Sequence, residues 1–544
     1  MMSWVADSTV GGVLSRTAEL YPDRNAMVFP GLGLRWSWRQ LNEVVDRVAE
    51  GLIQLGVGAG EHVGIWSMNV PEWVVAQFAV GRIGAVLVNV NPAYRIQELG
   101  DALAMADVAT LIVGAPFKGS DFVAMVESIR SEGRFPKLRK LVAIGERPGP
   151  DWSIWSDLAM GDESSKAEVD ARSRSARPSD VYNIQFTSGT TGLPKGAMLT
   201  HRNVLRNAFA TGERLRYSEV DRVCVPVPFY HCFGCVLGTL VCAVFGSTLV
   251  VPAPAFDAGA TLSAIAEERC TALYGVPTMF VAHLGHPDFD RFDLSSLRTG
   301  IMSGAPCPLP LMEQVVRRMG IREVCIGYGQ TEASPIITLT SVDDPIEVRV
   351  GTVGRPIEGL EVKLVDPATG REPDSGGAGE LCVRGHCVMA GYYNNPEATA
   401  RTIDPDGWLH SGDLARRRED GNYRIVGRCK ELIIRGGENI YPPEVEEFLH
   451  HHPAVAEVAV AGLPDAKYGE VVGAWVVLKP GASLTPDDLK EYARGRIAHY
   501  KIPQYVMIVT ALPRTVTGKI RKQVLKEDAI GTLGLGEAAQ IEMA

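Results

Sequence analysis

Residues 187–196 concentrate chemically useful side chains and read Thr-Ser-Gly-Thr-Thr-Gly-Leu-Pro-Lys-Gly. Glycines let a backbone approach a ligand closely, successive N–H groups form an anion-binding nest, and Lys195 adds a point charge. A flexible surface turn is the alternative, but a turn rarely combines four hydroxyls with a lysine. The sequence therefore predicts a loop that wraps a polyphosphate. Its candidate binding residues are Thr187, Ser188, Gly189, Thr190, Thr191, Gly192 and Lys195.

The spacing within this loop excludes two common nucleotide-binding motifs. A Walker-type loop has about four residues between its glycines and Ser or Thr after the lysine. Here Gly189 and Gly192 enclose two residues, and Gly196 follows Lys195. Residues 56–60 hold three glycines, but they follow a helical pattern and precede a strand pattern, which reverses the order of the dinucleotide-binding fingerprint. We expect a turn there.

A second group of candidates, residues 327–332, reads Gly-Tyr-Gly-Gln-Thr-Glu and directly follows a predicted strand over residues 321–326. Ligands of parallel sheets bind at the carboxyl ends of the strands. An aromatic ring such as Tyr328 can stack on a base, the Thr331 hydroxyl can bond a phosphate, and the Glu332 carboxylate can bind a hard cation. The alternative is an ordinary turn with an exposed Glu332.

Two shorter segments hold further candidates. Residues 408–413 end in Asp413 after a predicted tight turn, where a carboxylate could accept hydrogen bonds from sugar hydroxyls or cap a helix. Residues 229–234 place His231 in an apolar run, beside a C-x-x-C pair formed by Cys232 and Cys235. Such a pair can be redox-active or bind zinc. Because no second Cys/His cluster is available to complete a zinc site, we do not expect zinc there.

Taken together, these segments resemble the signatures of the adenylate-forming superfamily, which contains acyl-CoA synthetases, peptide-synthetase adenylation domains and firefly-type luciferases. The matching motifs follow the family's order from residue 187 to residue 519. Residues 273–280 and 433–442 most resemble medium-chain fatty acyl-CoA ligases. The resemblance implies an enzyme that uses ATP and Mg²⁺ and takes coenzyme A as a co-substrate.

The resemblance also implies roles in nucleotide binding. Tyr328 would stack on adenine, Thr331 would contact the α-phosphate, and Glu332 would ligate Mg²⁺. Asp413 and Arg428 match the positions that contact the ribose. The other residues matched to the adenine and phosphate positions are Gly304, Ala305, Pro306, Gly327, Gly329 and Gln330.

For catalysis, the resemblance points to four positions, namely Thr187, His231, Glu332 and Lys519. The family's counterpart of Lys519 enters the active site for the first half-reaction, and the counterpart of His231 lies near the substrate carboxylate. Lys430 matches the hinge about which the C-terminal domain rotates between the two steps. The segment that would then receive coenzyme A contains Arg435, Gly436 and Gly437.

These matches predict transfer of AMP to a carboxylic acid, followed by displacement of AMP by the thiol of coenzyme A. Residues 223–256 contain no acidic side chain that could hold a substrate amino group, which disfavours an amino acid. An alkyl or small aromatic acid fits better, and a medium-chain fatty acid is the leading prediction. The alternatives are an aryl or short acid, an enzyme that uses an amine or oxygen in the second step, and a catalytically silent protein. Intact Lys519, Glu332 and Asp413 argue against the last.

Bulk properties narrow the function classes further. A net charge of −10 argues against a general nucleic-acid-binding protein. Ten scattered cysteines and the lack of a signal-like or transit-like N-terminus predict a cytoplasmic location. Residues 223–256 carry no charge over a length that could cross a bilayer, but prolines and glycines interrupt them, so we expect buried core and no integral membrane association. The sequence leaves the oligomeric state open, with a homodimer among the options.

Elements that would position these residues alternate between strand and helix. Helices are predicted over residues 38–55 and 73–83, and strands over residues 62–66 and 85–89, which favours a parallel sheet covered by helices. Residues 163–179 are polar and predict a loop. The expected fold class is α/β, with a large N-terminal domain over residues 1–428 that includes a β-rich subdomain near residues 352–425. A small, mobile α+β C-terminal domain is expected over residues 429–544.

Overall fold

The computed structural model describes residues 3–117, 119–133, 135, 137–187, 194–367, 369–374, 376–435, 438–465, 467–514 and 520–536. The chain divides into two compact units. The first comprises Met1–Val362, Val383–His410 and Glu419–Tyr423, and the second comprises Lys363–Cys382, Ser411–Arg418 and Arg424–Ala544. The predicted domain boundary after residue 428 stays a prediction.

The first unit contains an eight-stranded sheet in the order β19-β9-β8-β4-β3-β5-β6-β7. Its strands are β3 (His62–Trp66), β4 (Val86–Val90), β5 (Thr110–Val113), β6 (Lys140–Ala143), β7 (Trp152–Ile154), β8 (Val181–Thr187), β9 (Lys195–Thr200) and β19 (Gly391–Tyr392). The strands from β8 to β7 run parallel, while β9 pairs antiparallel with both β8 and β19. The strand–helix alternation expected over residues 38–89 is therefore confirmed. The sequence did not predict that β9 would run antiparallel to its neighbours.

A nine-stranded sheet forms the other half of the first unit, in the order β16-β15-β14-β13-β12-β10-β11-β1-β2. Its strands are β1 (Asn25–Phe29), β2 (Leu34–Ser37), β10 (Arg222–Cys224), β11 (Thr248–Val250), β12 (Ala272–Gly275), β13 (Thr299–Ser303), β14 (Glu323–Gly329), β15 (Ile336–Leu339) and β16 (Arg355–Pro356). Neighbouring strands from β1 to β14 along the sheet pair in parallel. Their carboxyl ends therefore share one edge, as expected for ligand binding.

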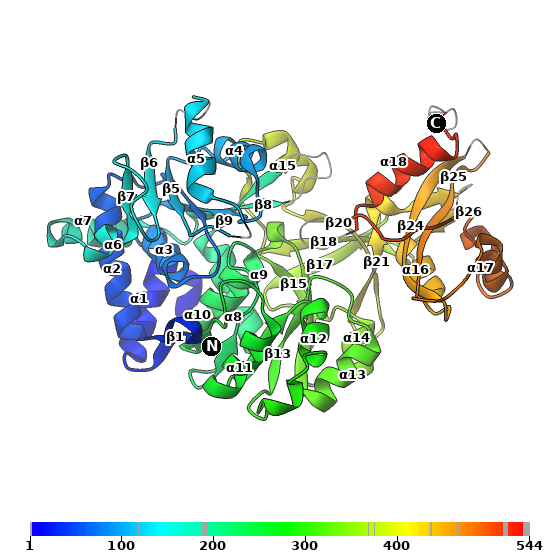
Figure 1. Cartoon of the computed structure of the whole chain (residues 1–544), viewed down its shortest axis with the longest axis horizontal. Helices are drawn as coiled ribbons and strands as arrows, with labels where there is room; N and C mark the ends of the chain where they lie inside the picture. The colour runs from blue at the N-terminus through cyan, green and yellow to red at the C-terminus, as the bar shows by residue number, and fades with distance from the viewer. Residues whose placement is uncertain are drawn as a thin grey trace. The chain divides into compact units, whose positions relative to one another are not determined.

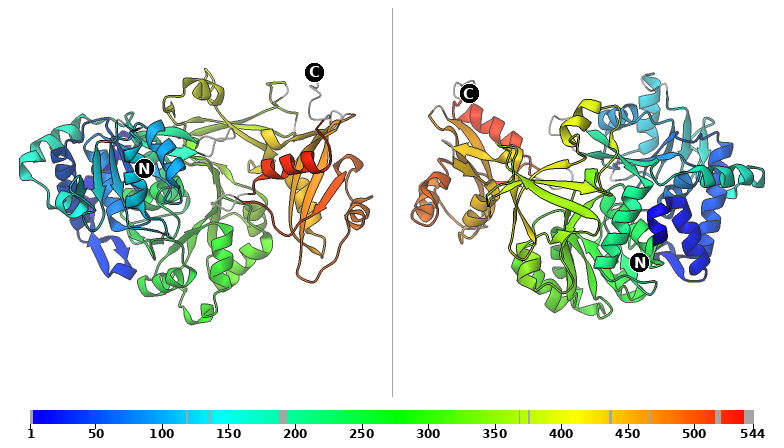
Figure 2. Two further views of the ribbon diagram at one scale, coloured as in Figure 1. Left: turned by 45° about the horizontal axis from the view of Figure 1, so that its top comes forward. Right: turned by 180° about the vertical axis from the view of Figure 1, so that it is seen from behind.

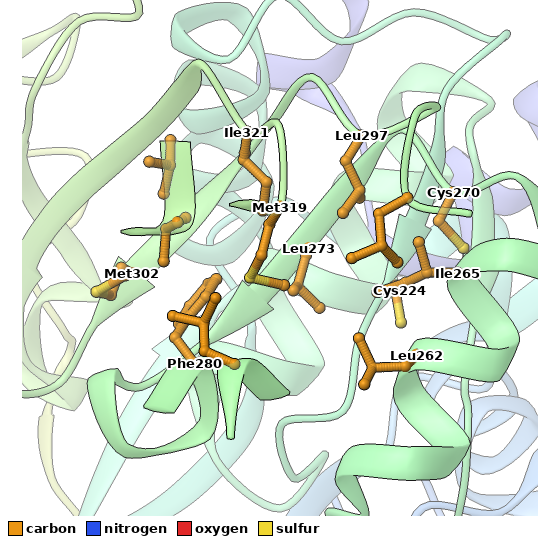
Figure 3. Packing of buried hydrophobic residues seen from close by; sticks show 14 of the residues in the cluster. Cys224, Leu262, Ile265, Cys270, Leu273, Phe280, Leu297, Met302, Met319 and Ile321 are labelled. Atoms are coloured by element: carbon orange, nitrogen blue, oxygen red, sulfur yellow. The ribbon is translucent and has the colours of Figure 1, made fainter. Parts of the chain in front are cut away.

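One hydrophobic core lies between this sheet and three helices, α11 (Ala258–Glu268), α12 (Pro277–Leu284) and α13 (Leu309–Arg318) (Figures 1 and 3). Leu273 and Met302 of the strands, Leu262 and Phe280 of the helices, and Met319 beyond α13 are buried within it (Figure 3). Close packing of this kind fixes the strands, so the loops at their ends have a rigid base.

The first unit contains further helices, some of them with clear capping signals in the sequence. The remaining helices of the first unit are α1 (Val10–Leu20), α2 (Trp38–Gln54), α3 (Pro71–Arg82), α4 (Ile96–Met105), α5 (Phe122–Ser131), α6 (Trp155–Met160), α7 (Lys166–Ser175), α8 (His201–Arg214), α9 (Cys232–Gly234), α10 (Val241–Phe245), α14 (Ile346–Gly351) and α15 (Pro396–Thr402). Thr200 caps α8 in a reciprocal capping box with Asn203. A π-helical stretch, Cys235–Leu240, joins α9 to α10.

The uncharged segment over residues 223–256 is thus divided among two short strands and the consecutive α9, π-helical and α10 stretches, and its side chains are largely buried. Among the helices that the structure describes, none is long and apolar enough to cross a membrane.

Residues 163–179 were predicted to form a loop, and that prediction is wrong. They contain the 3₁₀ turn Glu163–Ser165 and helix α7. Val169 is the one buried side chain of α7, so the helix has no apolar stripe that a periodicity argument could detect. Arg172 anchors it instead, through a hydrogen bond to the Val57 carbonyl at 2.8 Å, and forms an ion pair of 2.7 Å with Glu168 of the same helix.

A four-stranded sheet in the order β17-β18-β20-β21 confirms the β-rich region expected near residues 352–425. Its strands are β17 (Leu360–Val365), β18 (Gly379–Gly385), β20 (Leu409–Arg417) and β21 (Tyr423–Arg428). These strands contribute residues to both units.

The second unit also contains a five-stranded sheet, with the order β23-β22-β25-β24 and β26 paired to β25. Its elements are β22 (Ile433–Arg435), β23 (Glu438–Ile440), β24 (Val455–Asp465), β25 (Gly469–Leu478), β26 (Tyr505–Ile508), α16 (Pro442–His450), α17 (Pro486–Ala493) and α18 (Lys522–Thr532). Helix α18, red in Figure 2, packs on β24, with Leu525 and Ala529 buried in a shared cluster. The expected α/β fold with an α+β C-terminal part is confirmed.

Candidate active site

The two ends of the predicted phosphate loop are held side by side. Strands β8 and β9 pair antiparallel, and Thr187 lies directly opposite Lys195 in their register. A loop that joins two neighbouring hydrogen-bonded strands must reverse the direction of the chain between them. Such a reversal can direct several backbone N–H groups toward one bound anion. The intervening candidates Ser188, Gly189, Thr190, Thr191 and Gly192 lie outside the described residues.

Beside Lys195 lies a pair of side chains from distant segments. The Tyr392 hydroxyl donates a hydrogen bond of 2.7 Å to Oε1 of Glu332, and the Lys195 ammonium lies 4.9 Å from the centre of the Tyr392 ring. Burial, and then the adjacent Glu332 charge, raise the pKa of Tyr392 well above its ordinary value, so the phenol keeps its proton. We call Lys195, Glu332 and Tyr392 the phosphate cluster.

Strand β14 extends further than the sequence predicts. It was expected to end at Ile326, but it continues to Gly329 because residues 327–329 pair antiparallel with β15. Gly329 permits this pairing, since a Cβ there would lie 1.8 Å from the Pro335 carbonyl oxygen. Tyr328 and its neighbours are therefore strand residues rather than a turn after a strand.

The predicted adenine-binding residues come together at the end of this sheet. Ser303 lies opposite Gly327 in the parallel register of β13 and β14, and its hydroxyl donates to the Gly327 carbonyl at 2.7 Å. Gly304, Ala305 and Pro306, which follow the end of β13 at Ser303, are exposed, and Tyr328 follows Gly327 on β14. Small exposed residues beside an aromatic ring leave room for a planar base.

Two buried asparagines on α8, both missed by the sequence argument, hold backbone near Glu332: Asn207 holds the turn that carries it, and Asn203 holds residues 386–388. The Asn207 side chain donates to the carbonyls of Ala333 and Ile336, at 3.3 and 2.7 Å, and accepts from the Ile336 N–H at 3.2 Å. Asn203 donates to the His386 and Val388 carbonyls at 2.7 and 3.0 Å. A signal was available, because two asparagines four residues apart on an otherwise apolar helix face must find polar partners when buried.

His231 begins α9 and caps it, because its Nδ1 accepts a hydrogen bond of 3.1 Å from the Phe233 N–H. An acceptor Nδ1 leaves the proton of the neutral ring on Nε2, which is a suitable donor to a carboxylate oxygen. The neighbouring Cys232 thiol lies 3.6 Å from this Nδ1 and 3.8 Å from the Thr331 hydroxyl. The structure therefore brings the His231 segment against the 327–332 signature.

This acid segment, residues 227–235, is fixed by side-chain amides from the eight-stranded half of the unit. Asn69 donates to the Val227 carbonyl at 2.9 Å and accepts from the Phe229 N–H at 2.8 Å. Asn89 of β4 donates to the Tyr230 carbonyl at 3.2 Å, and Gln185 of β8 donates to the Cys235 sulfur at 3.3 Å. All three amides are buried, and no sequence argument identified them.

The second unit contains the other predicted residues. Asp413 lies within β20 rather than after a turn, next to Gly412 at φ +75°, and it forms an ion pair of 3.2 Å with Arg428. Lys430 is exposed in the 3₁₀ turn Cys429–Glu431. Arg435 donates to the Tyr500 carbonyl at 3.0 Å and lies over the Tyr468 ring. The candidates Gly436, Gly437 and Lys519 lie outside the described residues.

Comparison with known proteins now settles the family. A family model described as "AMP-binding enzyme" matches residues 14–393, and one described as "AMP-binding enzyme C-terminal domain" matches residues 444–519. The chain belongs to the AMP-binding enzyme family. The family predicted from the sequence motifs is therefore confirmed.

Individual relatives of this AMP-binding enzyme share most of its length. A protein of Bacillus subtilis (strain 168) named "Putative acyl-CoA synthetase YngI" is 46% identical, over 99% of this chain and 100% of its own. The Danio rerio "Medium-chain acyl-CoA ligase ACSF2, mitochondrial" is 41% identical, over 97% of this chain and 89% of its own. The crystal structure of the anthranilate CoA ligase AuaEII with anthranoyl-AMP matches with a TM-score of 0.84 at 29% identity, covering 97% of this chain and 98% of its own.

The phosphate cluster of this AMP-binding enzyme also offers a position for a divalent cation. Among the described residues, no lysine or arginine forms an ion pair with Glu332, and its Oε2 accepts no hydrogen bond. A partly buried carboxylate with one committed and one uncommitted oxygen, beside the predicted triphosphate loop, fits the way Mg²⁺ is bound by one or two carboxylates together with substrate phosphates.

Proposed function

We propose that this chain is an ATP-dependent acyl-CoA ligase that activates a medium-chain carboxylic acid as its acyl-adenylate and transfers the acyl group to coenzyme A. The observation that carries the proposal is the contact between the acid segment and the signature over residues 327–332, where Cys232 lies 3.8 Å from the Thr331 hydroxyl. This contact sets a segment suited to a carboxylic acid against a residue suited to the α-phosphate. Family membership and the named acyl-CoA ligases among the relatives support the same reaction.

In the first step, an oxygen of the acid attacks the α-phosphorus of ATP, and the bond from that phosphorus to the pyrophosphate oxygen breaks. His231 would hold the acid carboxylate through Nε2–H, and Thr331 would hold the α-phosphate. Lys195 would stabilise the negative charge that gathers on the departing pyrophosphate, an electrostatic contribution worth several kcal/mol in such sites. Bound Mg²⁺, held by Glu332, would supply Lewis-acid stabilisation of the phosphate oxygens.

In the second step, the sulfur of coenzyme A attacks the acyl carbon, and the bond to AMP breaks. Arg435, Gly436 and Gly437 would border the path of the thiol, Asp413 and Arg428 would hold the ribose, and Lys430 would be the hinge. Lys519 would act in the first step alone. We therefore expect Lys519→Ala to stop acyl-adenylate formation and to spare thioester formation from supplied acyl-adenylate; equal loss of both steps would contradict this division.

The proposed acid follows from the acid segment. Phe229, Cys232 and Phe233 are buried, and the Phe233 ring stacks on Tyr274 of β12 with 5.6 Å between ring centres. No acidic residue lies in residues 223–256, so an alkyl chain is favoured over an amino acid. This agrees with the medium-chain name of the Danio rerio relative.

The experiment that tests the proposed function measures AMP and pyrophosphate release by the full chain with ATP, Mg²⁺ and a panel of straight-chain, branched and aryl acids. With coenzyme A present, we expect acyl-CoA as the product and the highest kcat/KM for medium-length straight chains. Pyrophosphate release without any thioester would indicate that an amine or oxygen is the second substrate, and failure to release pyrophosphate with every acid would refute the proposal.

A further inference from the structure

Tyr392 is placed with little freedom between the two charged members of the phosphate cluster. Strand β19 pairs with β9, and Tyr392 lies opposite Ala197, two residues from Lys195 on the same strand. Its N–H donates to the Thr399 hydroxyl at 2.9 Å, and the tyrosine side chain is 6% exposed. A side chain held by strand pairing and burial keeps its rotamer, so its hydroxyl points at one fixed place.

Glu332 is tied to the same segment at two points. Its carbonyl accepts a hydrogen bond of 2.9 Å from the Met389 N–H, and its Oε1 accepts the Tyr392 hydroxyl at 2.7 Å. Because both the backbone and the carboxylate of Glu332 are anchored to residues 389–392, the rotation of the carboxylate is restricted. Its Oε1 is already engaged by the phenol, whereas its Oε2 accepts no hydrogen bond from the described residues and is the freer oxygen for a cation.

This commitment matters because divalent cations differ in how they bind a carboxylate. Mg²⁺ takes near-octahedral coordination at about 2.0–2.1 Å and accepts one oxygen from each carboxylate, with substrate phosphates and waters. Ca²⁺ is larger, takes about six to eight oxygen ligands, and often binds both oxygens of one carboxylate. A carboxylate with one blocked oxygen therefore penalises Ca²⁺ more than Mg²⁺.

We propose that Tyr392 is a specificity-determining residue, which makes Glu332 a one-oxygen ligand and so makes the nucleotide site prefer Mg²⁺ over Ca²⁺. The proposal rests on the proposed function, because it takes the phosphate cluster to be the metal–ATP site. Tyr392 acts through Glu332 and is a positioning residue for the metal ligand.

The adjacent tyrosine shows that the arrangement is not a general feature of this segment. Tyr393 also donates to a carboxylate, Asp107, at 2.9 Å, but Asp107 already pairs with Lys137 at 2.7 Å. That carboxylate has a resident cation, whereas Glu332 pairs with none among the described lysines and arginines. Tyr393→Phe therefore removes the same kind of hydrogen bond outside the phosphate cluster and is a matched control.

The test measures nucleotide affinity rather than turnover. The probe is α,β-methylene-ATP, in which the bond that breaks in the proposed reaction is replaced by a stable one. Calorimetric titration of the full chain gives its Kd at saturating Mg²⁺ and at saturating Ca²⁺. We expect the wild-type enzyme to bind the Mg²⁺ complex more tightly, and Tyr392→Phe to reduce the ratio of the two constants by about fivefold to tenfold. Tyr393→Phe is expected to leave the ratio unchanged.

A second comparison asks whether Tyr392 acts through Glu332. In a Glu332→Gln background the carboxylate is gone, so adding Tyr392→Phe should change the ratio by less than about twofold. Should Tyr392→Phe yield too little folded protein, Tyr392→Met fills the space without a phenol and takes its place.

The outcomes separate the inference from the proposed function. Failure of the wild-type chain to bind either metal–nucleotide complex would refute the proposed function. Wild-type binding without preference for Mg²⁺, an unchanged ratio in Tyr392→Phe, or an equal shift in Tyr393→Phe would each overturn the role of Tyr392 and leave the proposed function intact.

Discussion

The phosphate cluster and the acid segment meet near Thr331, yet they are held in place by different means. Lys195 and Tyr392 lie on paired strands, and their positions follow from backbone hydrogen bonds between β9 and β19. The acid segment has no such ladder at residues 227–231, where Asn69 and Asn89 hold its backbone groups. One region is charged and fixed by strands, and the other is uncharged and fixed by buried amides.

This difference suggests a division of labour. Substitutions in the phosphate cluster should slow activation of every acid by a similar factor, because the triphosphate is common to all reactions. Substitutions that loosen the acid segment should change the ranking among acids, because they alter the shape of an apolar surface. The experiments below test this division, from the largest expected effect to the smallest.

The largest effect is expected for Lys195→Ala. Removing one cation from a preorganised site that stabilises departing pyrophosphate should lower kcat/KM for ATP by about 100-fold or more. The factor should be the same for short, medium and branched acids when pyrophosphate release is measured. The exposed Lys467, substituted in the same way, serves as control. If the loss of kcat/KM depended strongly on which acid is used, the proposed division of labour between the phosphate cluster and the acid segment would be wrong.

Much of the phosphate cluster was predictable, because loops and strand ends carry residue types whose chemistry is local in sequence. Lys195, Thr331 and Glu332 were identified from short motifs. Tyr392 was not, since it reaches Glu332 only through the pairing of β19 with β9, about 200 residues apart, which residue spacing along the chain does not encode.

Most of the fold was predictable because its elements, like the motifs, leave patterns that are local in the sequence. Hydrophobic patterns and capping residues within a short stretch of sequence predict most strands and helices. Helix α7 has a single buried side chain, so its sequence shows no such periodic pattern.

The acid segment was the less predictable region. Its composition indicated an apolar pocket around His231, but the amides that hold it come from a segment before α3 and from strands β4 and β8. An asparagine in the sequence of a buried strand has no visible partner until the tertiary fold supplies one. The roles of Asn69, Asn89 and Gln185 are therefore consequences of tertiary contacts rather than of any motif.

The next largest effect is expected for Asn69→Ala. The substitution leaves the buried Phe229 N–H and Val227 carbonyl without their partner, which should lower the free energy of unfolding by about 2–5 kcal/mol. Urea unfolding measures this loss. In steady-state assays at a temperature where the variant is folded, KM for the acid should rise by more than KM for ATP.

A matched control for that test is Gln97→Ala, which removes an exposed amide hydrogen-bonded to Asp101 at 2.9 Å. It should change neither stability nor either KM measurably. Equal changes in KM for ATP and for every acid in Asn69→Ala would show that the hold of Asn69 on the acid segment does not act on acid selection.

A smaller effect concerns two buried histidines, His201, which lies near the Asp180 carboxylate, and His283. Burial lowers the pKa of His201 to about 4, and burial together with nearby His286 lowers the pKa of His283 to about 4. Since the unfolded state binds a proton near pH 6.5, stability is complete above that pH and is lost as the pH falls toward 4. Each histidine should account for about 2 kcal/mol of lost stability at pH 5.

Leucine substitutions distinguish the two histidines. His201 Nδ1 accepts the Val10 N–H at 3.0 Å, whereas neither ring nitrogen of His283 has a partner among the described residues. Both His201→Leu and His283→Leu should flatten the acid loss measured by urea unfolding between pH 7.5 and pH 5. At pH 7.5, His201→Leu should cost about 1–3 kcal/mol, and His283→Leu should cost less than about 1 kcal/mol. An unaltered pH slope in both variants would contradict the assigned pKa directions.

The smallest effect is expected for Cys232→Ser, although Cys232 lies where the two regions meet. Burial raises the pKa of its thiol to about 12, so the thiol stays protonated at neutral pH and is unsuited to a nucleophilic role. Its contacts with Thr331 and His231 are weak sulfur interactions at 3.8 and 3.6 Å. We expect kcat/KM to change by less than about threefold for every acid, with no change in iodoacetamide sensitivity, because the wild-type thiol should already be inert. A 100-fold loss of kcat/KM would mean that the sulfur takes part in the chemistry. The proposed division between a charged phosphate cluster and an apolar acid segment that meet near Thr331 would then be wrong.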